Sequence, residues 1–439
     1  MLAKGPGTEM MEGHAPALIL PPAPLHAGRR ALTLLASCSL TALSLAGCNG
    51  GLQPPTPLHI ALGTNSDQRL DSELREDFQE RLGLLERGFL RLHPHAVLQV
   101  ALYPGDQLIA AMQRRSRAGL EPDLIFVNGD TAVKLLNAGV VDPYPASPEL
   151  LRSFDPTLLD RVRDPQGRLA GVPLLVQTQL SCFNRQQIPE APRSLDELLQ
   201  LSASGVAIGL SVEPIQLTWT AGSLGAIPAV IQAVRGGEGF TAAHREALVR
   251  WLDWLKLASG QQRVVFFSSQ QEATAEFLAQ RVAWIPCSSL SLDLLRRQLG
   301  ANLGVAPLPD GPNQQQAAAL NRVRVIALGR HSSAQARRLA LDFVRFSANP
   351  LTQRSMTIGS LTVLPANRFV SLPLQSSQQL QAMQIAAEQG KQTNPLAGLM
   401  LSDDSRFPQM QTLLTRLVFG EATPAATADA LLQVLERRP

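Results

Sequence analysis

Residues 167–184 read GRLAGVPLLVQTQLSCFN, a long extended run that opens at Gly171-Val172-Pro173 and continues to Asn184. Two later stretches are also expected to be extended and contain proline. Residues 303–312, LGVAPLPDGP, contain three prolines, and residues 361–366, LTVLPA, are also extended and interrupted by proline. We interpret all three as places where the chain crosses between two parts of the fold, because prolines suit extended connections better than central strands.

Three crossings predict two lobes, each built from separate pieces of sequence. The expected N-terminal lobe comprises residues 58–176 and 310–362, and the expected C-terminal lobe comprises residues 177–309 and 363–439. A cleft between two α/β lobes is a natural ligand site, because such sheets bind ligands at the carboxyl ends of their strands.

Short apolar runs alternate with helical patterns along the chain. This alternation predicts an α/β fold with mostly parallel sheets covered on both faces. The clearest helix is expected between Leu70 and Leu92, capped by Ser66 or Asp67 and ended by Pro94. The runs expected to form strands are Leu58–Gly63, Val97–Tyr103, Leu124–Val127, Val172–Leu180, Val206–Leu210, Val282–Pro286, Leu303–Pro307 and Val323–Leu328.

The N-terminal segment predicts export and lipidation. An apolar run, Ala31 to Leu43, follows Arg29 and Arg30 and is too short to span a bilayer unaided. Leu-Ala-Gly-Cys, ending at Cys48, resembles the bacterial lipobox. We therefore expect residues 1–47 to be a lipoprotein signal peptide, Cys48 to carry the lipid, residues 48–57 to be a tether, and the body to lie outside the cytoplasm. A plain signal peptide, or a buried apolar helix with Cys48 incidental, is the alternative.

The composition and charge argue against a nucleic-acid-binding function. The net charge of +3 and the absence of a basic run give no sign of a nucleic-acid-binding surface.

Cys182 and Cys287 would remain in the mature chain as small buried hydrophobes, or as a disulfide that an exported location permits.

The sequence contains no motif of a serine hydrolase, P-loop enzyme or zinc protease. His93 and His95, in a turn, lack a third ligand, so no metal site is expected. No cofactor and no enzymatic activity are expected, with a lipoprotein hydrolase using acids such as Asp403 and Asp404 as the distant alternative.

Several motifs in order resemble the extracellular solute-binding proteins of ABC importers, in the branch that binds maltose and other sugars. They are FLRLHPHAVLQV (89–100), DLIFVNGD (123–130), LLNAGVVDPYP (135–145), the first two crossings, APRSLDELL (191–199) and ALDFVRFSANPLTQRS (340–355). The resemblance implies the two-lobed type II periplasmic-binding-protein fold with hinge crossings. It also implies a monomer that presents its ligand to a permease and its ATPase.

The resemblance also implies ligand positions. Asp130 follows the third strand, where sugar-binding relatives place an aspartate, although it could simply cap a helix. Glu213-Pro214 resembles a Glu-Pro pair of the maltodextrin cleft, but Ile215 stands where an aromatic residue is usual. Trp219 is a stacking platform or, alternatively, core. The implied substrate-binding residues are Thr64, Asn65, Ser66, Asp130, Gln177, Glu213, Trp219, Ser288, Asn321 and Arg322.

Other positions depart from the family pattern. Ser288 and its neighbours replace an aromatic after a strand, and Asn321-Arg322 replaces a Gly-Gly turn. With only two tyrosines and four tryptophans, the chain lacks the aromatic residues of oligosaccharide binders. We therefore expect a small carbohydrate or polyol as ligand. A charged solute, such as an organic acid, oligopeptide or polyamine, is the alternative.

Overall fold

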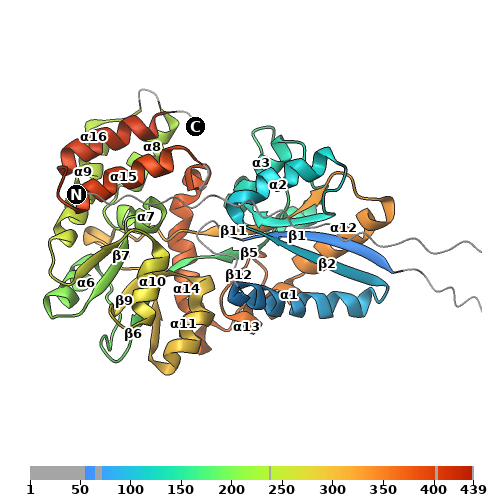
Figure 1. The fold of residues 1–439 in the computed structure, drawn as a ribbon, viewed down its shortest axis with the longest axis horizontal. Coiled ribbons are helices and arrows are strands. Elements are labelled where there is room, and N and C mark those ends of the chain that lie inside the picture. The colour runs from blue at the N-terminus through green and yellow to red at the C-terminus, as the bar shows by residue number, and fades with distance from the viewer. Residues whose placement is uncertain (1–54, 65–71, 237–238, 401–403, 438–439) are drawn as a thin grey trace, which may run out of the picture. The chain divides into compact units, whose positions relative to one another are not determined.

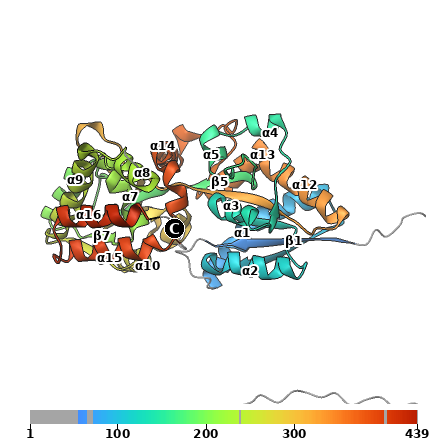
Figure 2. The ribbon, with the colours of Figure 1, turned by 90° about the horizontal axis from the view of Figure 1, so that it is seen from above.

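The computed structural model describes residues 55–64, 72–236, 239–400 and 404–437. The predicted signal peptide, Cys48, most of the tether, Asn65 and Ser66 lie outside these ranges. Residues 53–439 form one compact unit that contains two β-sheets with helices around each (Figures 1 and 2). Among the described helices, none combines the length and apolar character needed to cross a bilayer.

The first sheet has seven strands, in the order β12-β5-β11-β3-β1-β2, with β4 paired to β11. β1 pairs in parallel with β2 and β3, whereas β11 runs antiparallel to β3, β4 and β5. The strands are β1 (Thr56–Gly63), β2 (Ala96–Tyr103), β3 (Leu124–Asn128), β4 (Val141–Asp142), β5 (Val172–Gln177), β11 (Arg322–Gly329) and β12 (Leu364–Pro365).

The second sheet has five strands, in the order β10-β6-β9-β7-β8. β7 pairs in parallel with β8 and β9, and β6 runs antiparallel to both of its neighbours. The α/β class is confirmed, but both sheets are mixed rather than mostly parallel, because β11 and β12 in the first sheet and β6 in the second run antiparallel to their neighbours. The strands are β6 (Gln179–Asn184), β7 (Ile208–Ser211), β8 (Val264–Phe267), β9 (Trp284–Ser288) and β10 (Leu303–Ala306).

Helices cover both faces of the first sheet. In Figure 1, α2 and α3 lie on one side of β1 and β2, and α1 and α13 lie on the other. Leu85 and Phe89 of α1 are buried against the sheet, as the predicted helical spacing requires. The helices of this part are α1 (Ser72–Leu92), α2 (Gly105–Arg117), α3 (Gly129–Asn137), α4 (Pro148–Arg152), α5 (Pro156–Asp160), α12 (Ala334–Ala348) and α13 (Pro350–Ser360).

The second sheet is surrounded by the remaining helices. Ser194 and Ser269 begin α6 and α10 by accepting backbone N–H groups, as good N-cap residues do. The α-helices are α6 (Leu195–Ala203), α7 (Pro214–Ser223), α8 (Ile227–Arg235), α9 (Ala242–Ser259), α10 (Gln270–Leu278), α11 (Leu292–Leu299), α14 (Gln378–Gln389), α15 (Arg406–Val418) and α16 (Pro424–Leu435). Short 3-10 turns are η1 (Ser289–Ser291), η2 (Gly300–Asn302), η3 (Pro312–Gln314), η4 (Leu374–Ser376) and η5 (Gly390–Met400).

The chain passes between the two sheets three times, as expected. β5 continues through Thr178 into β6, β10 leads to β11, and β12 leads to α14, which packs on β6 and β10. The lobe boundaries drawn from the sequence stay a prediction. Each strand predicted from the sequence falls on an observed strand, although β1 begins at Thr56 rather than Leu58, and β4, β8 and β12 were not predicted.

A disulfide joins Cys182 on β6 to Cys287 on β9, so the expectation of two separate buried cysteines is wrong and the alternative of a disulfide is confirmed. In the antiparallel register Cys182 is opposite Ile285 and Leu180 is opposite Cys287, which makes the two cysteines diagonal neighbours. Their Cα atoms are 5.8 Å apart, within the range of a disulfide. Sequence could not reveal this, because 105 positions separate them.

Replacing both cysteines with alanine should lower the free energy of unfolding by about 2–5 kcal/mol, because the bond closes a long loop in the unfolded chain. Chemical denaturation of the oxidised protein and the double variant measures the difference. A reductant should destabilise the wild-type chain and leave the variant unchanged. Equal stability of the variant and the oxidised protein would contradict the assignment.

Candidate functional site

Polar residues collect at one edge of the first sheet because of its topology. β1, β3 and β5 run in the same direction, so their last residues, Gly63, Asn128 and Gln177, lie at the same edge of the sheet. β11 starts there, with Arg322 opposite Gln177. The turns after these strands are therefore neighbours, although they are far apart in sequence.

Arg324 holds two of these strand ends together. Its guanidinium donates to Gly63 O (2.5 Å), Phe126 O (3.2 Å) and Asn128 Oδ1 (3.1 Å), and lies 4.7 Å from the centre of the Phe126 ring. Burial, with the neighbouring charge of Arg322, lowers the pKa of Arg324 to about 9. Arg324 was not predicted as a site residue.

Asp130 lies in the first turn of α3 and is paired with a buried arginine. Arg161 Nη2 is 3.3 Å from Asp130 Oδ2, and Arg161 Nη1 donates to the backbone oxygen of Asn321 (2.6 Å). A Cβ atom on Gly129 would lie 2.9 Å from Arg161 O, so glycine permits this close approach. Asn321 in turn donates to Ala387 O (2.7 Å). Asp130, Arg161 and Asn321 thus form one chain of contacts.

A small polar cavity brings together three predicted residues, Gln177, Ser288 and Arg322. Gln177 and Arg322 come from the first sheet, and Ser288 comes from β9 of the second. A cavity of about 20 Å³ holds about one water molecule and is too small for a sugar ring, so a larger ligand would have to displace its walls. Its lining residues are Gln177, Thr178, Gln179, Gln216, Ser288, Leu320 and Arg322.

Two glutamines in this cavity were missed from the sequence. Gln179 Nε2 donates to Gln216 O (3.2 Å) and to Gln216 Oε1 (3.0 Å). This orientation leaves Gln179 Oε1 buried without a hydrogen-bond partner. Thr178 Oγ1 is also buried without a hydrogen-bond partner. Buried polar atoms are normally satisfied by protein, water or ligand. Gln177-Thr178-Gln179, three polar residues within an apolar run, was the available signal.

Other predicted residues have different surroundings. Thr64 is buried, and its Oγ1 accepts the N–H of Gly105 at the start of α2 (3.1 Å). Glu213 Oε2 accepts from Ser211 Oγ (3.1 Å) and from the backbone N–H of Gln270 at the start of α10 (2.7 Å). Neither Thr64 nor Glu213 lines the polar cavity.

Trp219 is core, and its assignment as a stacking platform is corrected. Its exposed fraction is 0%, and its ring packs 5.9 Å from that of Trp284 and 6.4 Å from that of Trp254. α7, which carries Trp219, is buried on all sides, so the helix has no face on which a ligand could stack.

The described residues contain no group of three or more His, Cys, Asp or Glu side chains arranged to hold a metal ion. Asp404 is buried and paired with Arg406 Nη2 at 2.7 Å. Arg406 also donates to Leu435 O and Arg437 O, so the pair fixes the end of α16. Asp403 lies outside the described ranges.

Solved structures share this fold. The GacH receptor of Streptomyces glaucescens, solved unliganded and with acarbose, matches with a TM-score of 0.67 and 16% identity, over 86% of this chain and 97% of that one. The maltose/maltodextrin-binding domain MalE of Bdellovibrio bacteriovorus, bound to maltotriose, matches with a TM-score of 0.62 and 17% identity, over 87% and 99%.

A further match is an ABC transporter solute-binding protein of Thermotoga lettingae bound to α-D-tagatose, with a TM-score of 0.60 and 17% identity, over 87% of this chain and 100% of that one. No protein-family model and no curated protein matches the sequence. At these identities the likeness establishes the fold alone, which is the α/β two-lobed periplasmic-binding-protein fold of these structures.

Arg324→Lys should lower the free energy of unfolding by about 2–4 kcal/mol, because one ammonium group cannot reach Gly63 O, Phe126 O and Asn128 Oδ1 together. Chemical denaturation measures the loss. Arg322→Lys, on the same strand but only partly buried, is the matched control and should lose less. Equal losses in the two variants would show that the three contacts of Arg324 are not important.

Proposed function

We propose that the chain is the solute-binding component of an ABC importer and binds a small carbohydrate or polyol. The observation that carries the proposal is the polar cavity in which Gln177 and Arg322 of the first sheet meet Ser288 of the second. A ligand there would touch residues of both sheets. The solved structures with the same fold include proteins bound to acarbose, maltotriose and tagatose.

The chemistry of the cavity suits hydroxyl groups. Amide side chains both donate and accept, serine does the same, and arginine donates several hydrogen bonds. Gln179 Oε1 and Thr178 Oγ1 are acceptors that have no partner in the protein. A polyol hydroxyl could donate to either of them and accept from a neighbouring amide.

The tryptophans favour a small ligand over a long oligosaccharide. All four, Trp219, Trp251, Trp254 and Trp284, are at least nine-tenths buried. Sugar rings in long-chain binders stack on exposed aromatic faces. The described surface offers no tryptophan for this purpose, so hydrogen bonds would carry most of the recognition.

Ligand binding would shift the population of the protein toward the conformation in which residues of both sheets contact the ligand. A ligand that contacts residues of both sheets has higher affinity for the conformation in which they meet, and this difference in affinity moves the equilibrium. The proposed partners are a permease and its ATPase, and no chemical step is required. The proposed anchor is a lipid on Cys48, which would hold the protein at the outer face of the cell membrane as a monomer.

An anionic solute, such as an organic acid, is the second candidate. Arg322 and Arg324 are two positions apart on β11, so their side chains project from the same face of the strand. Among the described residues, no carboxylate lies within ion-pair distance of Arg324, so its charge is balanced only by carbonyl and amide oxygens. An anion near this strand end would be attracted by both guanidinium groups.

A thermal-shift screen of sugars, polyols and organic acids tests the proposal. We expect at least one sugar or polyol to raise the melting temperature of the mature protein, because a ligand that binds only the folded state stabilises it. Stabilisation by organic acids alone would favour the second candidate. Stabilisation by neither class would contradict both.

Gln179→Leu should weaken binding of the identified ligand about tenfold, because one hydrogen-bonding amide is lost. Isothermal titration calorimetry measures the change. Gln200→Leu, an exposed glutamine on α6, is the matched control and should bind like wild type. Unchanged affinity in Gln179→Leu would place the ligand elsewhere.

A further inference from the structure

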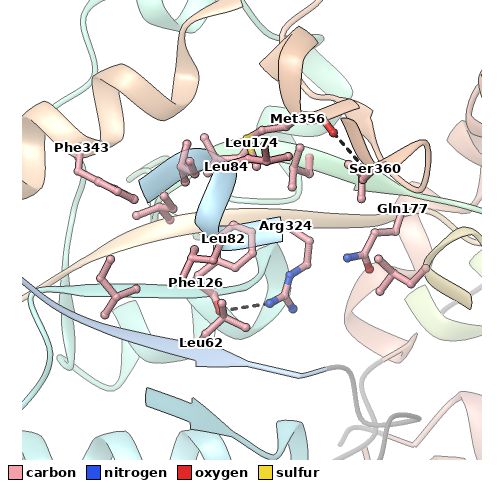
Figure 3. Close-up of a pocket in the computed structure, with 16 residues that line it drawn as sticks. Leu62, Leu82, Leu84, Phe126, Leu174, Gln177, Arg324, Phe343, Met356 and Ser360 are labelled. Carbon is pink, nitrogen blue, oxygen red and sulfur yellow. Dashed lines mark hydrogen bonds between the residues drawn. The ribbon is translucent and has the colours of Figure 1, made fainter. Parts of the chain in front are cut away.

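A second cavity lies between the first sheet and the helices α1, α12 and α13. Its volume is about 80 Å³, and its walls are almost wholly apolar. Figure 3 shows Arg324 between Phe126 and Gln177, with Met356 and Ser360 on the opposite wall. The other apolar walls come from residues Ile60, Leu62, Leu82, Leu84, Leu85, Leu174, Leu175, Leu290, Ile326, Phe343 and Val363.

Gln177 connects this apolar cavity to the polar one, because it is a lining residue of both. Ser288 and Leu290 form a second link, since Ser288 lines the polar cavity and Leu290, in η1, lines the apolar one. Both links involve residues of the proposed ligand site. The two cavities are therefore neighbouring compartments with opposite chemistry.

The apolar cavity is not explained by the packing of the fold. Protein cores are packed to crystal density, and an apolar void lowers stability in proportion to its volume. An apolar cavity of about 150 Å³ admits benzene, so about 80 Å³ has room for a short alkyl group. Arg324 is the one ionisable group of its lining, and its hydrogen bonds to Gly63, Phe126 and Asn128 already engage it.

We infer that the ligand carries a small apolar substituent, and that the two compartments together recognise a glycoside with a short alkyl aglycone. The polar cavity would hold the hydroxyl groups of the sugar, and the apolar cavity would bury the alkyl group beside Gln177 and Leu290. This inference rests on the proposed function, because it assumes that the sugar binds at the polar cavity.

The test compares methyl and n-butyl glycosides of glucose, galactose and mannose by calorimetry with the mature protein. Each methylene buried should strengthen binding about fourfold, so the butyl glycoside of the recognised sugar should bind about sixtyfold more tightly than its methyl glycoside. An octyl chain should add nothing further, because it exceeds the cavity. Equal affinity of the methyl and butyl glycosides would overturn the inference and leave the proposed function intact.

Ser360→Phe, on α13, should fill the cavity and abolish the advantage of the butyl group without weakening the methyl glycoside. Ser360 is only partly buried; its hydroxyl donates to Met356 O within the same helix (3.0 Å) and accepts the backbone N–H of Thr362 (3.4 Å). Ile358→Phe on the same helix is the control, because Ile358 is 38% exposed and does not line the cavity. An unchanged butyl advantage in Ser360→Phe would overturn the inference.

A spectroscopic readout does not depend on this variant. Met356 lines the cavity, and its methyl resonance, assigned by Met356→Leu, should shift with the butyl glycoside and not with the methyl glycoside. If none of the glycosides binds, the thermal-shift screen still tests the proposed function, and 1-butanol probes the cavity alone. A shift of the Met356 resonance with 1-butanol would support an apolar subsite, and no shift would overturn it. A shift of the Met356 resonance with pentanoate, but not with 1-butanol or the butyl glycosides, would also overturn the inference.

Discussion

The continuous passage of the chain from β5 through Thr178 into β6 is the constraint on which the rest of the fold depends. Every residue of both strands is buried, and Thr178 is buried between them. A polar segment in this position must satisfy its backbone and side chains internally. The Thr178 N–H donates to Ser289 Oγ of η1, which directly follows β9 of the second sheet (3.2 Å), while Gln177 pairs with Arg322 of the first sheet. Neighbouring residues of this segment thus contact parts of both sheets.

Two buried arginines organise the polar edge next to this passage. Arg324 gathers the ends of β1 and β3, and Arg161 joins Asp130 to Asn321. Buried guanidinium groups are costly to desolvate, and several hydrogen bonds to oxygen atoms offset that cost. The result is a set of polar turns held at defined positions by contacts across the sheet rather than along the chain. Such an arrangement suits a binding site, because preorganised groups lose little freedom when a ligand arrives.

Polar and apolar compartments meet at Gln177, which gives the proposed site two kinds of selectivity. Hydrogen-bonding groups discriminate by the positions of donors and acceptors, whereas an apolar cavity discriminates by volume. The burial of Trp219 removes this residue as a stacking platform for a sugar ring. The disulfide between Cys182 and Cys287 fastens β6 to β9, the strands that carry one side of the polar cavity.

The sequence by itself determined the α/β class, the three crossings and most strands, because apolar periodicity and proline positions are local signals. It also predicted Gln177, Ser288 and Arg322 as site residues, and the fold brings these three to one cavity. The lobe boundaries, the lipid anchor and the ligand-binding roles of these and the other site residues stay predictions. Only the tertiary structure decided the disulfide, the core position of Trp219, the roles of Arg324 and Gln179, and the apolar cavity. Each of these depends on which distant residues meet across strands and helices, and strand register and packing are set by the whole fold rather than by neighbours in sequence.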